Sequence, residues 1–276
     1  MDALPIRFEH ELRAWSSQLN DNIDRLEESM HRLRKLPLGG TAVGSGINCI
    51  PGFVGLALKS IHSHSGINFE KTDSTYKGLS SIDTVLEVSG HLKTSAITLI
   101  KIANDLRWMN SGPHSGLAEI RLQPLQPGSS IMVDKINPVI PEAICMAAAM
   151  VIGNDTSITI AAQSGNFQLN TMLPLAASDL LNSGKLIANA SRALGEKAIA
   201  TMEILVDQME ISVSKNPVLV TSLSPYIGYM KAADIAQKAR ETGRSVFEIA
   251  REETDLDEEL LSRLLDPRYL ADGGKD

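Results

Sequence analysis

Apolar residues recur every three or four positions along much of this chain, a spacing that places them on one face of a helix. Residues 8–33 carry such a series with charged residues between its members, which predicts one long helix that ends before Pro37. A second series covers residues 80–106, and Ser80 and Asp83 are predicted to form a capping box at its start. Both segments are expected to turn one apolar face toward a helical bundle.

Two later segments, residues 138–164 and 170–200, are apolar around much of their circumference. This pattern indicates long helices that are buried on several sides. The pattern then changes to three shorter amphipathic segments, at residues 229–242, 245–252 and 257–265, each predicted to form a helix.

Strand-like alternation is nearly absent, so the fold class expected is all-α: a bundle of long helices followed by a small helical C-terminal domain. The predicted domains are residues 1–221 and 222–276. Gly243 is expected to cap the C-terminus of one short helix, and Ser245 with Glu248 to form a capping box on the next.

The 276 residues carry a net charge of −7, and the basic residues are scattered. This argues against nucleic acid or an acidic membrane surface as a partner. The first residues show no signal-peptide pattern, and the longest apolar run, residues 143–152, is shorter than the ~20 residues that span a bilayer. The sequence therefore predicts a cytoplasmic protein with no membrane segment. Low aromatic content and runs of alanine in the long helices favour oligomerisation over a monomeric bundle.

The most informative segment for chemistry is residues 128–138, Gly-Ser-Ser-Ile-Met-Val-Asp-Lys-Ile-Asn-Pro. Its serine pair can place a hydroxyl beside a substrate, Lys135 offers a point charge, and Asn137 offers an amide for a carboxylate. Asn137 is also a favourable N-cap and Pro138 a favourable first helical residue, so a helix is predicted to begin there. A helix N-terminus carries free N–H groups, which makes this loop a candidate anion site.

This segment resembles the G-S-S-x-M-P-x-K-x-N-P signature of the fumarase/aspartase superfamily. The resemblance runs from Asp2 to about Gly273 and includes residues 38–48, 101–107 and 165–170. Residues 219–233 are similar to the L-V-T-x-L-N-P-x-I-G-Y-D-K-A-A form of class II fumarases.

The resemblance implies a homotetramer whose central bundle receives long helices from every subunit. It also implies an anti elimination across a small dicarboxylate, which in the fumarase form is the reversible hydration of fumarate to L-malate. No cofactor and no metal site is expected.

By the family pattern Ser129 is the catalytic base, while Ser130, Lys135 and Asn137 bind the substrate. Glu142 is expected to hold a catalytic histidine that positions or protonates the leaving group. Without the resemblance, the same segment is more simply a Gly/Ser turn before a capped helix.

That histidine belongs to a T-x-x-H-x-x-Q-D-A-x-P-I type segment, and residues 1–6 match only its tail. The chain alone is therefore expected to be inactive, and a partner chain is expected to supply the missing N-terminal region of the site. Two alternatives stay open. One is an enzyme like aspartate ammonia-lyase, because residues 137–142 are also close to the aspartase form. The other is a non-catalytic remnant, or one half of a split lyase that acts as an oligomeric structural subunit.

The signature has one departure, Val133-Asp134, where fumarases usually carry Pro-Gly. The change removes a fixed φ and a permissive glycine, and it adds a negative charge next to Lys135. We therefore expect weaker binding of a dianionic substrate.

Overall fold

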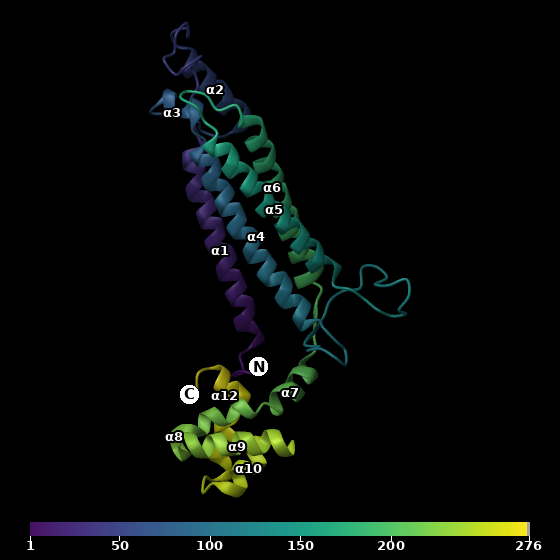
Figure 1. Ribbon diagram of the computed structural model, residues 1–276. Coiled ribbons are helices and arrows are strands. Elements are labelled where there is room, and N and C mark those ends of the chain that lie inside the picture. Colours follow the sequence, from purple (N-terminus) through teal and green to yellow (C-terminus); the bar gives the residue numbers. More distant parts are fainter. Residues whose placement is uncertain (275–276) are drawn as a thin grey trace. The chain divides into compact units, whose positions relative to one another are not determined.

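A computed structural model describes residues 1–274 of the chain, and helices make up most of it (Figure 1). The all-α class predicted from the sequence is confirmed. Four long helices form a bundle: α1 (Phe8–Leu33), α4 (Asp83–Met109), α5 (Val139–Gln163) and α6 (Leu173–Leu194).

Shorter elements connect these helices and build the C-terminal part. The helices are α2 (Phe53–Ser65), α3 (Thr75–Ser80), the π-helix η1 (Gly195–Ile199), α7 (Val206–Ser214), the 3₁₀-helix η2 (Pro217–Leu223), α8 (Ser224–Ile227), α9 (Tyr229–Thr242), α10 (Val246–Glu253), α11 (Glu258–Leu264) and α12 (Pro267–Ala271). Two small sheets pair β1 (Lys35–Leu36) with β2 (Glu70–Lys71) in parallel, and β3 (Ile120–Arg121) with β4 (Glu203–Ile204) antiparallel.

The chain divides into two compact units. One contains residues 1–16, 109–121 and 203–276, and the other contains residues 17–108 and 122–202. The predicted C-terminal domain, residues 222–276, lies within the first of these units. Its boundary at residues 221/222 stays a prediction.

The bundle core is apolar where α4 and α5 face each other. Leu92 and Ala96 of α4 pack in one cluster with Ala148 and Val151 of α5. Ala148 is buried, as is Ala161 further along α5, and their small side chains let α6 run closely along α5.

Hydrogen bonds between polar side chains also connect the bundle helices. Asn22 of α1 donates from Nδ2 to Thr98 Oγ1 of α4 at 2.9 Å. Asp155 of α5 accepts a hydrogen bond of 2.7 Å from Ser89 Oγ and one of 2.6 Å from Lys93 Nζ, both on α4. Because a shift of one helix along the other would leave the buried Asp155 unpaired, these contacts favour a single register.

The C-terminal helices enclose a second apolar core. Leu223, Ile235, Ile249 and Leu261, from η2, α9, α10 and α11, are almost completely buried there. This core explains why the short amphipathic segments fold as helices, since none of them is long enough to be stable alone.

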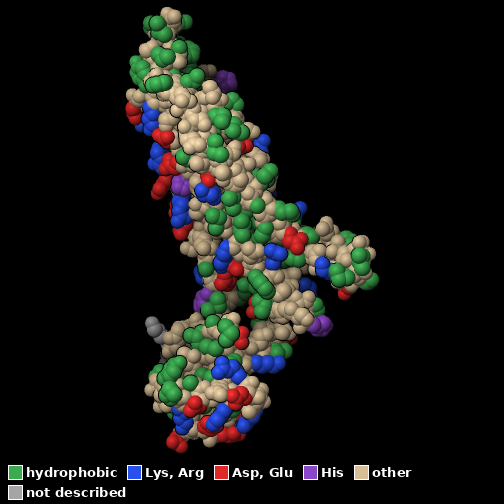
Figure 2. Space-filling view, in the orientation of Figure 1, with side chains coloured by type: hydrophobic (Ala, Val, Ile, Leu, Met, Phe, Trp, Pro, Cys, Tyr) green, Lys and Arg blue, Asp and Glu red, His purple; other side chains and the backbone are tan. Residues whose placement is uncertain are grey.

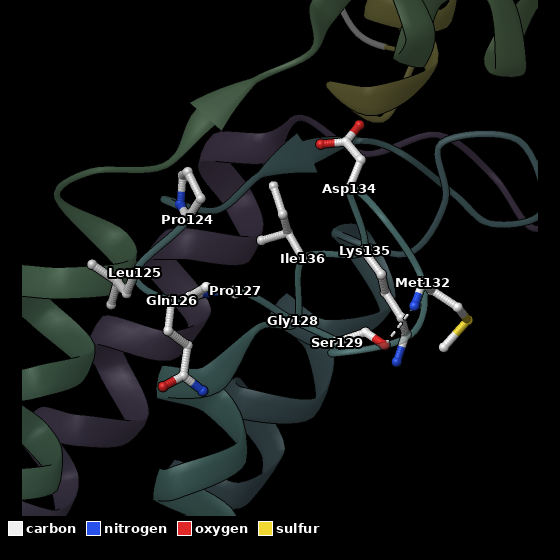
Figure 3. A pocket seen from close by; sticks show the side chains of 10 residues that line it. All are labelled: Pro124, Leu125, Gln126, Pro127, Gly128, Ser129, Met132, Asp134, Lys135 and Ile136. Atoms are coloured by element: carbon white, nitrogen blue, oxygen red, sulfur yellow. Dashed lines mark hydrogen bonds between the residues drawn. The ribbon is translucent and has the colours of Figure 1, made fainter.

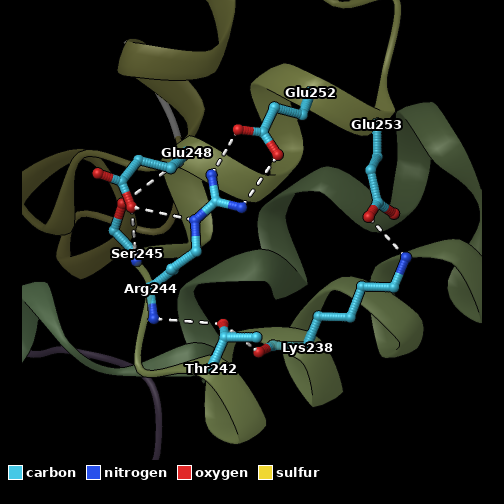
Figure 4. Close-up of polar contacts among 7 residues, drawn as sticks. All are labelled: Lys238, Thr242, Arg244, Ser245, Glu248, Glu252 and Glu253. Atoms are coloured by element: carbon cyan, nitrogen blue, oxygen red, sulfur yellow. Dashed lines mark hydrogen bonds and ion pairs between the residues drawn. The ribbon is translucent and has the colours of Figure 1, made fainter.

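The capping predicted for this part is confirmed. Gly243 has φ 69° at the end of α9, and Ser245 and Glu248 form a complete capping box at the start of α10. Figure 4 shows Arg244 between Glu248 and Glu252, and Lys238 paired with Glu253 at 2.6 Å. These exposed pairs connect α9, its following turn and α10 and contribute little individually.

The capping box predicted at Ser80 and Asp83 is wrong. Ser80 is the last residue of α3, whose cap is Ser74, and α4 begins at Asp83 after an extended Ser81. The break has a packing cause: Gly165 approaches the Ser80 carbonyl so closely that a Cβ there would lie 2.4 Å from its oxygen.

Helix α5 is the one helix among residues 1–274 that is long and apolar enough, by length and composition, to cross a membrane. A core helix of a bundle passes the same test, so this is weak evidence for a membrane segment. Burial of Asp155 in an ion pair with α4 is typical of such a core helix.

Candidate active site

The serine-containing loop predicted to be functional connects β3 to α5 and extends away from the bundle helices (Figure 1). Its tip is highly exposed: Ile131 and Val133 show 89% and 97% of their surface. The tip of the loop is therefore not packed against the helices of its own unit.

The loop is closed at its neck by Gly128 and Asn137. Asn137 donates from Nδ2 to the Gly128 carbonyl at 2.9 Å. A Cβ on residue 128 would lie 1.8 Å from the Lys135 carbonyl oxygen and 2.9 Å from the Asn137 nitrogen. Only glycine therefore allows the two sides of the neck to meet, and residues 129–136 form a compact loop beyond it.

The prediction that Asn137 caps the next helix is wrong by one residue. Helix α5 begins at Val139 with Pro138 in the capping position, and among the described residues no side chain caps this end. The Asn137 amide is instead engaged at the neck of the loop. Glu142 lies in the first turn of α5, as expected, and is half-buried.

Ser129 is held by the backbone that follows it. Its Oγ accepts hydrogen bonds from the backbone N–H groups of Ile131 at 3.1 Å and Met132 at 2.9 Å. Two N–H donors on one hydroxyl oxygen favour its ionised form over its neutral form. The sequence suggested Ser129 from its motif, but this local electrostatic support depends on the fold of the turn.

A cavity of 390 Å³ opens inside the loop, and Figure 3 shows the ten described residues that line it. Ser129 and Lys135 lie on its wall, and the Lys135 side chain extends alongside Ser129. The other expected site residues, Ser130, Asn137 and Glu142, are not among the lining residues. Ser130 is exposed, and Asn137 lies at the neck. The structure thus brings together two of the five expected residues.

Val133 and Asp134, which stand where fumarases usually carry Pro-Gly, lie in the middle of a turn from Met132 to Lys135. Asp134 has φ 64°, in the left-handed region, and the closing hydrogen bond from Lys135 N to Met132 O is long, at 3.4 Å. Proline followed by glycine is the favoured pair for a turn whose third residue is left-handed. In Figure 3 the Asp134 carboxylate points away from both Ser129 and the Lys135 side chain.

Residues that the motif did not single out also line the cavity: Leu125, Gln126 and Ile136. In Figure 3 the Gln126 amide points away from Ser129 and Lys135, so Gln126 contributes to the wall of the cavity on its other side. Its sequence neighbourhood gave no signal, because a glutamine between prolines is an ordinary loop residue.

Metal binding finds no support among the described residues, where no group of three or more His, Cys, Asp and Glu side chains could hold an ion.

Comparison with known proteins agrees with this fold. The model of a family described as Lyase matches residues 1–153, and the model described as Fumarase C C-terminus matches residues 219–272. The chain belongs to the fumarase/aspartase lyase family.

Relatives in this family are strongly similar in sequence. A class II fumarate hydratase of Xylella fastidiosa is 50% identical over 274 residues, which cover 99% of this chain and 58% of that protein. An aspartate ammonia-lyase of Pseudomonas aeruginosa is 42% identical and is covered to 57%. The chain thus spans less than two thirds of the length of the relatives it matches.

Solved structures show the same fold. The class II fumarase of Schistosoma mansoni has a TM-score of 0.94 at 30% identity, covering all of this chain and 60% of that one. A Brucella melitensis structure described as fumarate lyase:delta crystallin, bound to cobalt, has a TM-score of 0.93 at 39% identity, covering 98% and 59%.

Proposed function

We propose that this chain contributes the Ser129 loop to a fumarate hydratase, which adds water reversibly to fumarate to give L-malate. One observation carries the proposal: a serine hydroxyl that accepts two backbone N–H donors lines the same cavity as a lysine. Class II fumarate hydratases among the relatives support water as the leaving group.

In the dehydration direction, Ser129 as a serinate removes the proton from the malate carbon next to one carboxylate. The electron pair moves into that carboxylate and creates an aci-carboxylate dianion, which needs positive charge and hydrogen-bond donors. Lys135 supplies the charge, and Ser130 and Asn137 are proposed to bind substrate once the exposed loop is covered. The dianion then expels the hydroxyl at the neighbouring carbon as water, leaving the trans double bond.

The proton for the departing hydroxyl comes, in this proposal, from the family histidine that Glu142 would hold. No segment of this sequence matches the histidine-bearing part of the family pattern. A polypeptide of residues 1–276 alone is therefore expected to have no measurable activity, and robust turnover by it, free of host enzyme, would contradict this assignment.

Ser129→Ala tests the central role. In an assembly that has activity, we expect kcat for fumarate hydration to fall by ~10²-fold or more, the usual effect of losing a positioned base. Ser130→Ala is the matched control one residue away, and it should raise KM more than it lowers kcat. An unchanged kcat in Ser129→Ala would remove this residue from catalysis.

A second candidate is aspartate ammonia-lyase, favoured by the 42% identical relative with that activity in its name. It would use the same base and an aci-carboxylate intermediate of the same kind, which in this case keeps the amino group until it leaves as ammonia. Parallel assays of malate and L-aspartate as substrates separate the two, and faster turnover of L-aspartate would favour this candidate.

Assembly into a homotetramer is also proposed, supported by the resemblance and by the exposed apolar residues Met146, Met150 and Ile160 of α5. The cytoplasmic location expected from the sequence stays a prediction.

A further inference from the structure

A polar cavity of 640 Å³ lies at the end of the bundle where α1 ends and α4 begins. Its walls come from the last turn of α1, β1, the segment that follows β2, α3 and the first turns of α4. The Ser129 loop follows the opposite end of α4, about 40 Å away at 1.5 Å per residue along a helix of 27 residues. This cavity is therefore separate from the candidate active site within the same unit.

The cavity is shaped by backbone contacts. Parallel pairing of Lys35 with Glu70 brings the segment after β2 beside Lys35, whose Nζ lies 2.9 Å from Asp73. On the opposite wall, a Cβ on Gly78 would lie 2.7 Å from the Pro37 side chain, so glycine lets α3 pack directly on Pro37. These contacts keep the cavity open without a ligand.

Most residues that line the cavity carry a polar or charged side chain. Pro37 and Gly78 are the exceptions in the lining set, and the set includes the hydroxyls of Ser81 and Thr84 at the start of α4. A cavity with several charged and hydroxyl groups can bind a small charged ligand through hydrogen bonds and ion pairs.

Three ion pairs lie among the residues that line the cavity, and they differ in distance and in exposure to water. Arg32 makes two hydrogen bonds to Glu87, which is the least exposed of the three acids. The Lys77 and Asp83 charges are 3.7 Å apart, and the Asp83 side chain is 72% exposed. An exposed pair at this distance contributes little, so its carboxylate can turn into water at small cost.

The pair of Lys35 and Asp73 is closer, at 2.9 Å, but it is also exposed to water. The Asp73 side chain is 88% exposed, whereas that of Lys35 is 43% exposed. In both pairs the acid is thus more exposed than the lysine, 72% against 67% for Asp83 and Lys77. When the two acids turn outward, the wall presents two ammonium groups and the hydroxyls at the N-terminus of α4.

We propose that this cavity binds a small molecule with at least two oxyanionic groups, phosphate or carboxylate, between Lys35 and Lys77. The ligand displaces Asp73 and Asp83 from the two lysines and accepts hydrogen bonds from the hydroxyls of Ser81 and Thr84. The proposal concerns binding and does not depend on the lyase activity.

Calorimetric titration of the protein with pyrophosphate and, separately, with malonate tests it. We expect one site for at least one probe, and the tighter probe identifies the group that the cavity prefers. Lys77→Met should raise Kd by about tenfold, the change expected for losing one charge-assisted contact. Asp83→Asn should lower Kd, because it removes the carboxylate that competes for Lys77.

Two controls separate this site from other positive groups. Lys71→Met removes a neighbouring lysine of β2 that does not line the cavity, and Lys135→Met removes the lysine of the candidate active site. Both should leave Kd within about twofold of the unmodified protein. Circular dichroism should show that each variant is folded. Lys77→Arg keeps the positive charge and should retain binding.

The proposal is overturned if neither probe binds at about 10 mM, a concentration at which even Kd values near 1 mM are saturated. It is equally overturned if Lys71→Met or Lys135→Met weakens binding as much as Lys77→Met, or if Asp83→Asn fails to tighten it.

Discussion

At the scale of single residues, Gly128 decides whether the serine loop exists in its present form. A side chain at this position meets the Lys135 carbonyl at 1.8 Å, a separation that atoms cannot adopt. The neck must therefore open in any substituted protein, and the Asn137 hydrogen bond that depends on it is lost as well. The glycine acts through geometry and contributes no chemical group of its own.

Gly128→Ala is accordingly expected to lower kcat/KM for the proposed reaction by about 10²-fold, since a misplacement of ~1 Å has that effect. Thermal stability should change little, because the loop is exposed and packs outside the core. Gly55→Ala is the matched control: its Cβ would enter open space on α2, and helix propensity predicts a slight gain in stability. Equal activity of the two variants would show that the neck does not shape the site.

Asp134 is the second decisive residue, because it occupies a left-handed position at φ 64°. Replacing Val133-Asp134 by Pro-Gly should relieve this position and preorganise the turn, with KM for a dicarboxylate falling severalfold. A gain that shrinks at high salt would assign the effect to the Asp134 charge, and a gain independent of salt would assign it to the backbone. Since the carboxylate points away from Lys135, we expect the backbone effect to dominate. An unchanged KM at every salt concentration would mean that the turn is already competent.

At the scale of elements, the buried carboxylate of Asp155 fixes α5 against α4. Its side chain is 7% exposed, whereas that of its partner Lys93 is 41% exposed. Removing either partner therefore has unequal consequences. Without Lys93, the buried carboxylate of Asp155 has Ser89 as its remaining partner. Without the charge on Asp155, the side chain of Lys93 can turn into water.

Lys93→Met should lower the free energy of unfolding by about 1–3 kcal/mol, the penalty for a poorly paired buried charge. Asp155→Asn should cost less than half as much, because its amide can still pair with Ser89. The control Lys59→Met, on the exposed surface of α2, should stay within about 0.5 kcal/mol. Chemical denaturation measures all three, and the reverse order of the first two would refute the unequal roles.

Some elements of the fold could be predicted from the sequence, and others could not. Helical periodicity predicted the bounds of α1 and α9 closely, because each has apolar residues at spacings of three and four. Helices α2 and α3 could not be predicted in this way, because neither of them buries a residue. Within the site, the motif identified Ser129 and Lys135. The neck contact of Asn137 was not predictable, because it requires a carbonyl nine residues away that only the folded loop brings near.

At the scale of the whole molecule, α5 presents an apolar stripe that its own bundle does not cover. Met146, Met150 and Ile160 are exposed by 68%, 57% and 49%, and Ala149 and Gly153 lie on the same exposed face. In Figure 2 charged side chains follow the α1 edge of the bundle, whereas hydrophobic ones are spread over its neighbouring face. A monomer rarely keeps such a surface in water, and small residues along the stripe would let another helix approach closely.

We therefore expect light scattering to give an oligomer, most simply four chains, at micromolar concentration. Met146→Lys combined with Met150→Lys should shift the protein toward smaller species, because two adjacent charges on the stripe would be buried without partners. Met230→Lys on α9 is the matched control: this methionine is 72% exposed but belongs to the other unit and lies off the stripe, so assembly should persist. A well-behaved monomer before any substitution would contradict assembly through α5. Dissociation by the Met230 variant alone would move the interface to the C-terminal helices.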